Sequence, residues 1–146
     1  MSAFLGLTDA VRDALLANPA LAGGNVQRGR GVPLPAASSQ GIDISVASSR
    51  AQPLGLAEGS LQWETTIVVV CKARANAAGD GESAIDPLLV AAWQRLLGMA
   101  TPPGASGMTL DPAIQWDIEE ADQPVAAASL ALRITHITTT ATLAAS

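Results

Sequence analysis

The chain has 146 residues, a formal net charge of −5 and a single cysteine. This length is sufficient for one hydrophobic core, so we expect a single domain over residues 1–146. The eight Lys and Arg residues are scattered and aromatic residues make up only 3% of the chain, which argues against direct nucleic-acid binding. A lone cysteine excludes an intrachain disulfide and suits a reducing compartment, and no apolar run has membrane-spanning length.

The N-terminal part of the chain combines a short helix with loop-forming sequence. Thr8 has the residue type of an N-cap, and the apolar residues that follow recur at helical spacing, so we predict a helix over residues 9–17. A brief strand is predicted at residues 25–28. Residues 29–41 are rich in Gly, Pro, Ser and Ala, which predicts a loop that carries Arg30. No basic segment precedes an apolar one at the N-terminus, so we expect no signal peptide.

The middle of the chain reads as two strands joined by a turn at residues 52–59. Residues 42–46 alternate apolar and polar side chains, as a half-buried strand does. Residues 61–74 give the strongest strand signal, and between residues 67 and 71 both faces of that strand are apolar. We therefore expect its middle to be buried on two sides, with the second face covered either by this chain or by a neighbouring subunit.

The second half of the chain is predicted to hold one helix and two strands. Asp86 and Pro87 have the residue types of an N-cap and a first helical position. In order, we predict a polar turn at 76–82, a helix at 86–97, a Gly/Pro loop at 101–111, a strand at 114–119, an acidic turn at 120–124 and a strand from 125 to about 140. Trp63, Trp93 and Trp116 are expected to be the bulkiest core members.

The resulting order, α-β-β-β-α-β-β, predicts an α+β fold. We expect a mainly antiparallel sheet of about five strands with two helices packed on one face.

No set of residues has the spacing of a catalytic or metal site. His136 is the only histidine, and Cys71 lies within an apolar strand, where a buried, inert thiol is expected. Asp117 and Glu119 share a strand face that could hold a hard cation, but without ordered ligand spacing a solvated strand face is the simpler interpretation. The Gly-rich residues 23–31 lack the Gly-Lys-Ser/Thr of a phosphate loop. We predict no catalytic residues, no metal and no cofactor.

Taken together, these segments resemble the tail terminator (tail completion) proteins of long-tailed bacteriophages, the family of the lambda minor tail protein U. The resemblance is carried by the N-terminal helix, the long strand at residues 62–74 and the helix that begins Asp86-Pro87-Leu88-Leu89. It continues with the strand that contains Trp116, the acidic turn and the final segment at residues 129–138. His136 stands where that family has an aromatic residue near the end of the last strand.

The resemblance implies a structural virion protein that assembles as a homohexameric ring at the head-proximal end of the tail tube. Such a ring stops tube polymerisation and offers a surface for head attachment. The implied partners are other copies of the chain, the tail tube protein and the head-completion or connector protein. DNA would pass through the lumen without specific binding. Assembly would take place in the host cytoplasm, and no membrane, cofactor or enzymatic activity is implied.

The expected contacts of this ring lie on exposed loops and charged residues. The loops at residues 29–41 and 101–111 are predicted to contact tube or connector. Inter-subunit salt bridges are predicted to join Arg28, Arg30 and Arg50 to Glu119, Glu120 or Asp122. Two alternatives remain open: another head–tail connector, such as a stopper or sheath terminator, and a small α+β enzyme or ligand-binding domain that uses Asp86 or Glu82.

Overall fold

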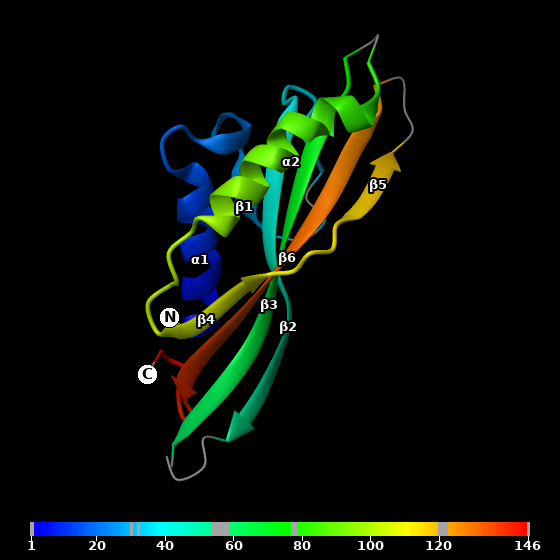
Figure 1. Cartoon of the computed structure of the whole chain (residues 1–146). Coiled ribbons are helices and arrows are strands. Elements are labelled where there is room, and N and C mark those ends of the chain that lie inside the picture. Colours follow the sequence, from blue (N-terminus) through cyan, green and yellow to red (C-terminus); the bar gives the residue numbers. More distant parts are fainter. Residues whose placement is uncertain are drawn as a thin grey trace.

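In a computed structural model, two helices cover one face of a six-stranded sheet (Figure 1). The structure describes residues 2–29, 31, 33–53, 59–76, 79–119 and 123–145. The elements are α1 (Ala3–Leu16), the 3-10 turn η1 (Leu21–Gly24), β1 (Val26–Arg28), β2 (Gln40–Pro53), β3 (Ser60–Arg74), α2 (Gly81–Leu97), β4 (Ala105–Leu110), β5 (Gln115–Glu119) and β6 (Val125–Thr139). The predicted α+β class is confirmed.

The sheet has the strand order β1-β2-β3-β6-β4, and β5 also pairs with β6. Among the described residues, β1 and β2 pair in parallel and the other strand pairings are antiparallel. β3 pairs with β6 along its whole length, whereas β4 pairs with residues 132–136 of β6 and β5 pairs with residues 125–129. β4 and β5 therefore lie one after the other along the same outer edge of β6.

The core lies between the helices and one face of the sheet. In β3, alternate residues from Thr65 to Ala73 are at most 1% exposed, so this face of the strand lies in the core. Register places these residues beside the apolar face of β6, with Ile67 opposite Leu132 and Val69 opposite Leu130. The helices cover this face with Leu7, Val11, Leu15, Ile85, Leu88, Leu89, Ala92 and Leu96, all buried. Burial of apolar side chains such as these is the main favourable term in folding.

The other face of the sheet is only partly covered. Val68 and Val70 of β3 are half-buried, and the helices lie on the opposite side. Next to Val70, Lys72 Nζ lies 2.6 Å from Asp43 Oδ2 in an ion pair whose side chains are 16% and 9% exposed. The middle of β3 is therefore fully buried on one face and half-buried on the other, which is less than the predicted burial on both faces.

The start of α1 differs from the prediction. The N-cap is Ser2, whose Oγ accepts a hydrogen bond from the Leu5 amide at 3.4 Å, and the helix begins at Ala3. Thr8 lies inside the helix, is 4% exposed, and donates its hydroxyl proton to the Leu5 carbonyl at 2.8 Å. A mid-helix threonine can bond back to the preceding turn in this way, so its residue type alone did not mark a helix end.

The start of α2 also differs. Asp80 is the N-cap: its Oδ1 accepts from the Ser83 amide at 2.7 Å and its Oδ2 from the Ser83 hydroxyl at 3.0 Å. These bonds lower the pKa of the Asp80 carboxyl. The predicted cap Asp86 is exposed within the helix, and Pro87 lies inside it. Asp80 and Asp86 both have a residue type that suits an N-cap. The helix begins after Asp80 because it is the Asp80 carboxylate that reaches a free backbone amide.

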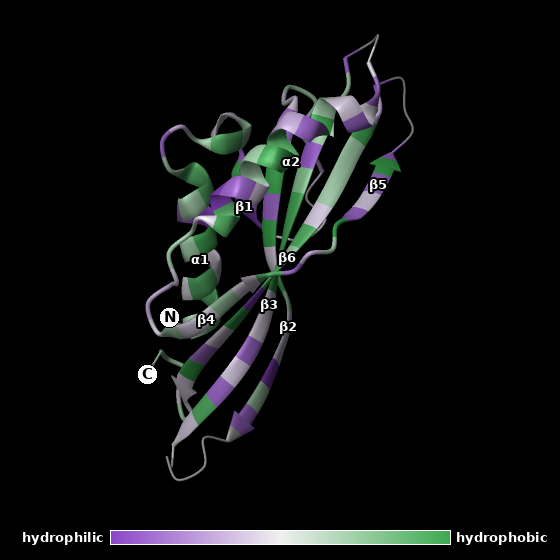
Figure 2. Cartoon of the chain, in the orientation of Figure 1, coloured by the Kyte–Doolittle hydropathy of each residue, from purple (hydrophilic) through white to green (hydrophobic). Residues whose placement is uncertain are grey.

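The strand predicted at residues 42–46 was too short, and one strand was missed. β2 runs from Gln40 to Pro53, and β4 occupies most of the loop predicted at residues 101–111. Their polar or glycine-containing sequences give little alternation, so pairing with β3 and β6 determines their conformation. We call residues 48–53 of β2, 60–66 of β3 and 133–139 of β6 the arm. In Figure 1 the arm extends beyond both helices, and Figure 2 shows that it carries many hydrophilic residues.

Candidate functional site

His136 is held in a buried polar chain rather than in an accessible site. Its side chain is 2% exposed, on the same face of β6 as the buried Ile134, and burial lowers its pKa. Nε2 lies 2.7 Å from Thr65 Oγ1, which lies 3.0 Å from Ser49 Oγ. A hydroxyl beside an imidazole resembles a nucleophile and its base. However, Thr65 has no exposed surface, so no substrate can reach its hydroxyl in this conformation.

The remaining chemical candidates are separated from one another or buried. Cys71 has no exposed surface, and burial raises the pKa of its thiol to about 12, which leaves it protonated and inert at neutral pH. Asp117 and Glu119 are exposed on β5. Among the described residues, no three His, Cys, Asp or Glu side chains are grouped to hold a metal ion. Within the same residues, no helix is both long enough and apolar enough to cross a membrane.

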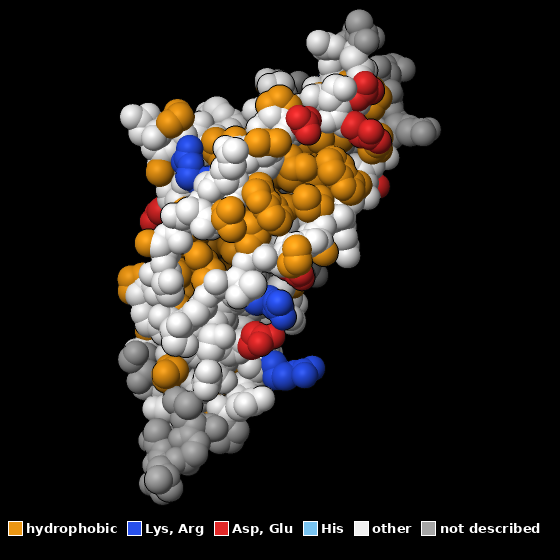
Figure 3. Space-filling model, in the orientation of Figure 1, with side chains coloured by type: hydrophobic (Ala, Val, Ile, Leu, Met, Phe, Trp, Pro, Cys, Tyr) orange, Lys and Arg blue, Asp and Glu red, His pale blue; other side chains and the backbone are white. Residues whose placement is uncertain are grey.

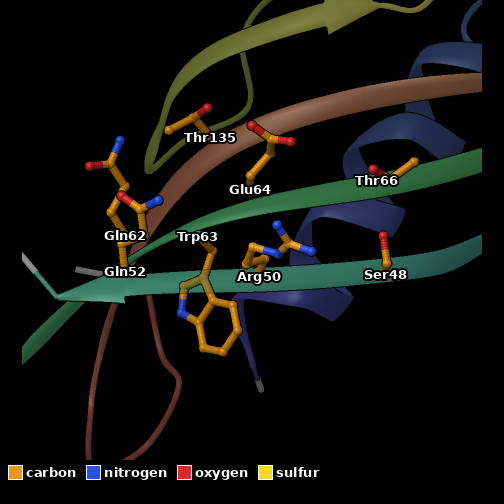
Figure 4. A pocket seen from close by; sticks show the side chains of 8 residues that line it. All are labelled: Ser48, Arg50, Gln52, Gln62, Trp63, Glu64, Thr66 and Thr135. Atoms are coloured by element: carbon orange, nitrogen blue, oxygen red, sulfur yellow. The ribbon is translucent and has the colours of Figure 1, made fainter.

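The open face of the arm, which is the face turned away from α1, forms a polar groove of about 430 Å³ (Figure 4). Its lining is Ser48, Arg50, Gln52, Gln62, Trp63, Glu64, Thr66 and Thr135. Arg50 lies directly opposite Glu64 in the β2–β3 register. These hydroxyl, amide and charged groups can form hydrogen bonds with another polypeptide, but they include no activated nucleophile.

An aromatic cluster fixes the arm to α1. Figure 4 shows Glu64 and Thr66 on one side of the arm and the Trp63 indole on the other. There the Phe4 ring meets Trp63 edge-on at a centroid distance of 5.0 Å and His136 at 5.2 Å. Trp63 Nε1 also donates to Thr138 Oγ1 at 2.8 Å. Because edge-to-face pairs and a satisfied indole N–H stabilise one geometry, the arm is a rigid extension of the sheet near its base.

Large apolar side chains are exposed along α2 and β5. We define the α2–β5 surface as Val90, Trp93, Leu97, Trp116 and Ile118. Leu97 is 66% exposed, Trp116 52%, Val90 46% and Ile118 41%, while Trp93 is half-buried. Figure 3 shows a band of hydrophobic side chains along α2 toward β5. A soluble monomer rarely exposes a contiguous surface of this kind without a partner.

The orientation of α2 determines where this surface lies, because one side of the helix faces α1 and the other side is exposed. Arg95 Nη1 donates to the carbonyls of Ala14 and Ala17 at 2.9 and 2.8 Å, and Nη2 donates to that of Pro19 at 2.9 Å, so this side of α2 faces α1. At 100° per residue, Val90 and Leu97 lie on the other side of the helix, toward the edge formed by β4 and β5. Acidic residues at the start of α2 border the surface: Asp80, Glu82 and Asp86. Asp117 and Glu119 share the opposite face of β5 with Gln115.

A second surface with exposed apolar residues lies at the opposite edge of the sheet. A groove of about 530 Å³ separates the N-terminal half of α1 from β2. Leu5 and Val46, which line it, are 41% and 37% exposed. We call it the α1–β2 groove. Arg28, another lining residue, holds its Nη1 3.1 Å from Asp9 Oδ1 in a partly exposed ion pair. This groove could receive a projecting apolar side chain.

The predicted interface residues are spread over the molecule. Arg28 has its intrachain partner Asp9, whereas Arg50 forms no ion pair within the part of the chain that the structure describes. In the sheet register Arg50 lies level with Thr135 of β6, and Glu119 lies level with Val125 of the same strand. Arg50 and Glu119 are therefore roughly 33 Å apart along the strand direction. Arg30, Glu120 and Asp122 lie outside the described residues. Salt bridges between subunits stay a prediction.

The sequence did not identify the exposed apolar surface. Trp116 was expected in the core, and this expectation was wrong, because its side chain is 52% exposed. Trp63 and Trp93 are half-buried, so the fully buried core consists of smaller side chains. One available signal was the run of alanines at residues 126–128, which pair with β5. Their small side chains leave little core volume for α2 to cover at that end.

Comparison with known proteins gives a likeness of fold. No protein-family model matches the sequence, and no curated protein matches it. Among solved structures, the chain is similar to one from the virion of a native gene transfer agent (GTA) particle, with a TM-score of 0.57 and 19% sequence identity. The likeness covers 94% of this chain and 99% of the other. At this identity it establishes a shared fold over nearly the full length of both chains.

Proposed function

We propose that this chain is a virion structural protein that caps the head-proximal end of a phage-like tail tube as a ring, stops tube polymerisation and offers a surface for head attachment. The observation that carries the proposal is the pair of partly apolar surfaces at opposite edges of the sheet. The full-length likeness to a chain of a gene transfer agent virion supports the same class of function, because it places this fold within a phage-like particle.

Exposed apolar groups at two edges suit assembly better than catalysis. Tryptophan and other large side chains supply most of the binding energy when they fill a partner's pocket. A surface at one edge that contacts a different surface at the opposite edge of the next copy repeats around an axis and can close into a ring. The homohexamer implied by the family resemblance is one such closed arrangement.

Charge supports the proposed place of the ring in the virion. The net charge of −5 disfavours retention of DNA in a lumen, because like charges repel. The arm supplies a second contact surface, since the groove on its open face offers hydroxyl, amide and charged groups. We assign the arm and the segment between β1 and β2 to contacts with the tube protein or the head connector.

A tube-length assay tests the proposal. Purified protein is added to polymerising tail tube subunits, and tube lengths and ends are measured by negative-stain electron microscopy. We expect shorter tubes with a ring at one end. Trp116→Lys should abolish shortening, while the matched variant Gln115→Lys should retain it, because Gln115 is exposed on the other face of the same strand.

Tube growth that the wild-type protein leaves unchanged would reject the terminator role. The same assay with isolated heads added distinguishes a tail terminator from the alternative head–tail connector. A stopper would bind the head vertex and leave tube length unaffected.

A further inference from the structure

We propose that the α2–β5 surface of one copy docks into the α1–β2 groove of the next copy. This inference rests on the proposed function, because it names the contact through which copies form the ring. The partner is therefore a second copy of this chain, bound head to tail.

The two surfaces have different shapes and lie at different ends of the sheet. β2 and β1 form one end of the strand order, and β4 and β5 lie along the other. The α2–β5 surface presents projecting side chains, of which Leu97 and Trp116 are more than half exposed. The α1–β2 groove is a hollow with partly exposed Leu5 and Val46 in its lining. A projection that meets a hollow gives a heterologous contact, and repetition of that contact carries the chain around a ring.

Charge distinguishes the two edges in the same sense. Asp80, Glu82 and Asp86 lie beside this surface at the start of α2, and Arg95, the one basic residue of α2, points toward α1. At the α1–β2 edge two arginines, Arg12 and Arg28, balance two aspartates, Asp9 and Asp13. Head-to-tail docking therefore places an acidic surface against an edge of balanced charge, whereas docking of two α2–β5 surfaces would oppose acid to acid. Like-charge repulsion of this kind disfavours the symmetric pairing.

The composition of the two surfaces fits a specific interface. Such interfaces bury roughly 800 Å² on each partner, with an apolar centre rich in aromatic side chains and a charged rim. The α2–β5 surface has both components: Trp116, Leu97 and Ile118 supply exposed apolar area, and Asp80, Glu82 and Asp86 at the start of α2 supply charged groups. A single exposed tryptophan among aliphatic neighbours is a typical hot spot.

Cysteine crosslinking tests the docking directly. The native Cys71 is fully buried and protonated, so added cysteines are the reactive thiols. Ile118→Cys marks the α2–β5 surface and Val46→Cys marks the groove. Each variant is treated with a short bismaleimide alone and in a one-to-one mixture, and products are separated by denaturing electrophoresis. We expect crosslinked dimers in the mixture and few in either variant alone.

Matched controls give the expected size of the effect. Gln115→Cys, exposed on the opposite face of β5, should not crosslink to Val46→Cys. Adding Trp116→Lys to the Ile118→Cys chain should reduce the yield by about tenfold or more, the loss expected for a hot-spot tryptophan.

Two results would overturn the inference. Strong dimers of Ile118→Cys alone would mean that two α2–β5 surfaces meet each other. A mixture without crosslinks would mean that the groove does not receive this surface. Crosslinked mixtures that leave tube length unchanged would support the docking and reject the terminator role, whereas shortened tubes without crosslinks would reject the docking alone.

Discussion

Arg95 is the link between the two helices, and its removal should destabilise the fold measurably. Arg95→Ala deletes three charge-assisted hydrogen bonds of 2.8–2.9 Å to carbonyls at and beyond the C-terminus of α1. A hydrogen bond to a charged group contributes about 1.5–3 kcal/mol. Arg95 is half exposed, so water replaces much of each bond and the three do not add. We expect a total loss of about 2 kcal/mol, or roughly 6–8 °C in Tm for a chain of this length.

Urea unfolding followed by tryptophan fluorescence measures this loss. Arg133→Ala is the matched control: Arg133 is exposed and, within the described ranges, forms no ion pair, so its loss should change stability by less than about 0.5 kcal/mol. Arg95→Lys should fall between the two, because an ammonium reaches fewer of the carbonyls than a guanidinium. Equal stability of Arg95→Ala and Arg133→Ala would refute the role assigned to this link.

Three further predictions follow from burial. Leu130→Ala should cost about 3 kcal/mol in the same urea titration, since Leu130 has no exposed surface and its loss leaves a cavity; a cost below about 1 kcal/mol would contradict the core. Burial lowers the pKa of His136 below its ordinary 6.5, so the unfolded chain binds more protons and stability should fall as pH drops below about 6.5. His136→Gln should lose this dependence between its unfolded and lowered folded pKa, and a variant that keeps the whole slope would assign it to other groups. Cys71, with its pKa raised to about 12, should not react with Ellman's reagent at pH 8 until urea unfolds the chain, and fast reaction of the native protein would show that the thiol is accessible.

Local signals located element ends less well than element interiors. Thr8 and Asp86 both have the residue type of an N-cap, yet Ser2 and Asp80 perform that role. A cap depends on which side chain oxygen reaches a free amide, and several residues near each helix start could do so. β4 was missed for a related reason: a short glycine-containing segment becomes a strand because β6 offers an edge to pair with.

The sequence by itself determined the α+β class and the long β3 and β6 strands. A period of two assigns each side chain of β3 to one face or the other, but both faces are apolar at its middle, so the pattern left open which face becomes the core. The pattern could not show how far the covering layer extends. α2 covers the core face of β3 and β6 but leaves Trp116 and Ile118 of β5 open. Whether an apolar face becomes core or contact surface depends on what packs over it, and only the tertiary structure decides that.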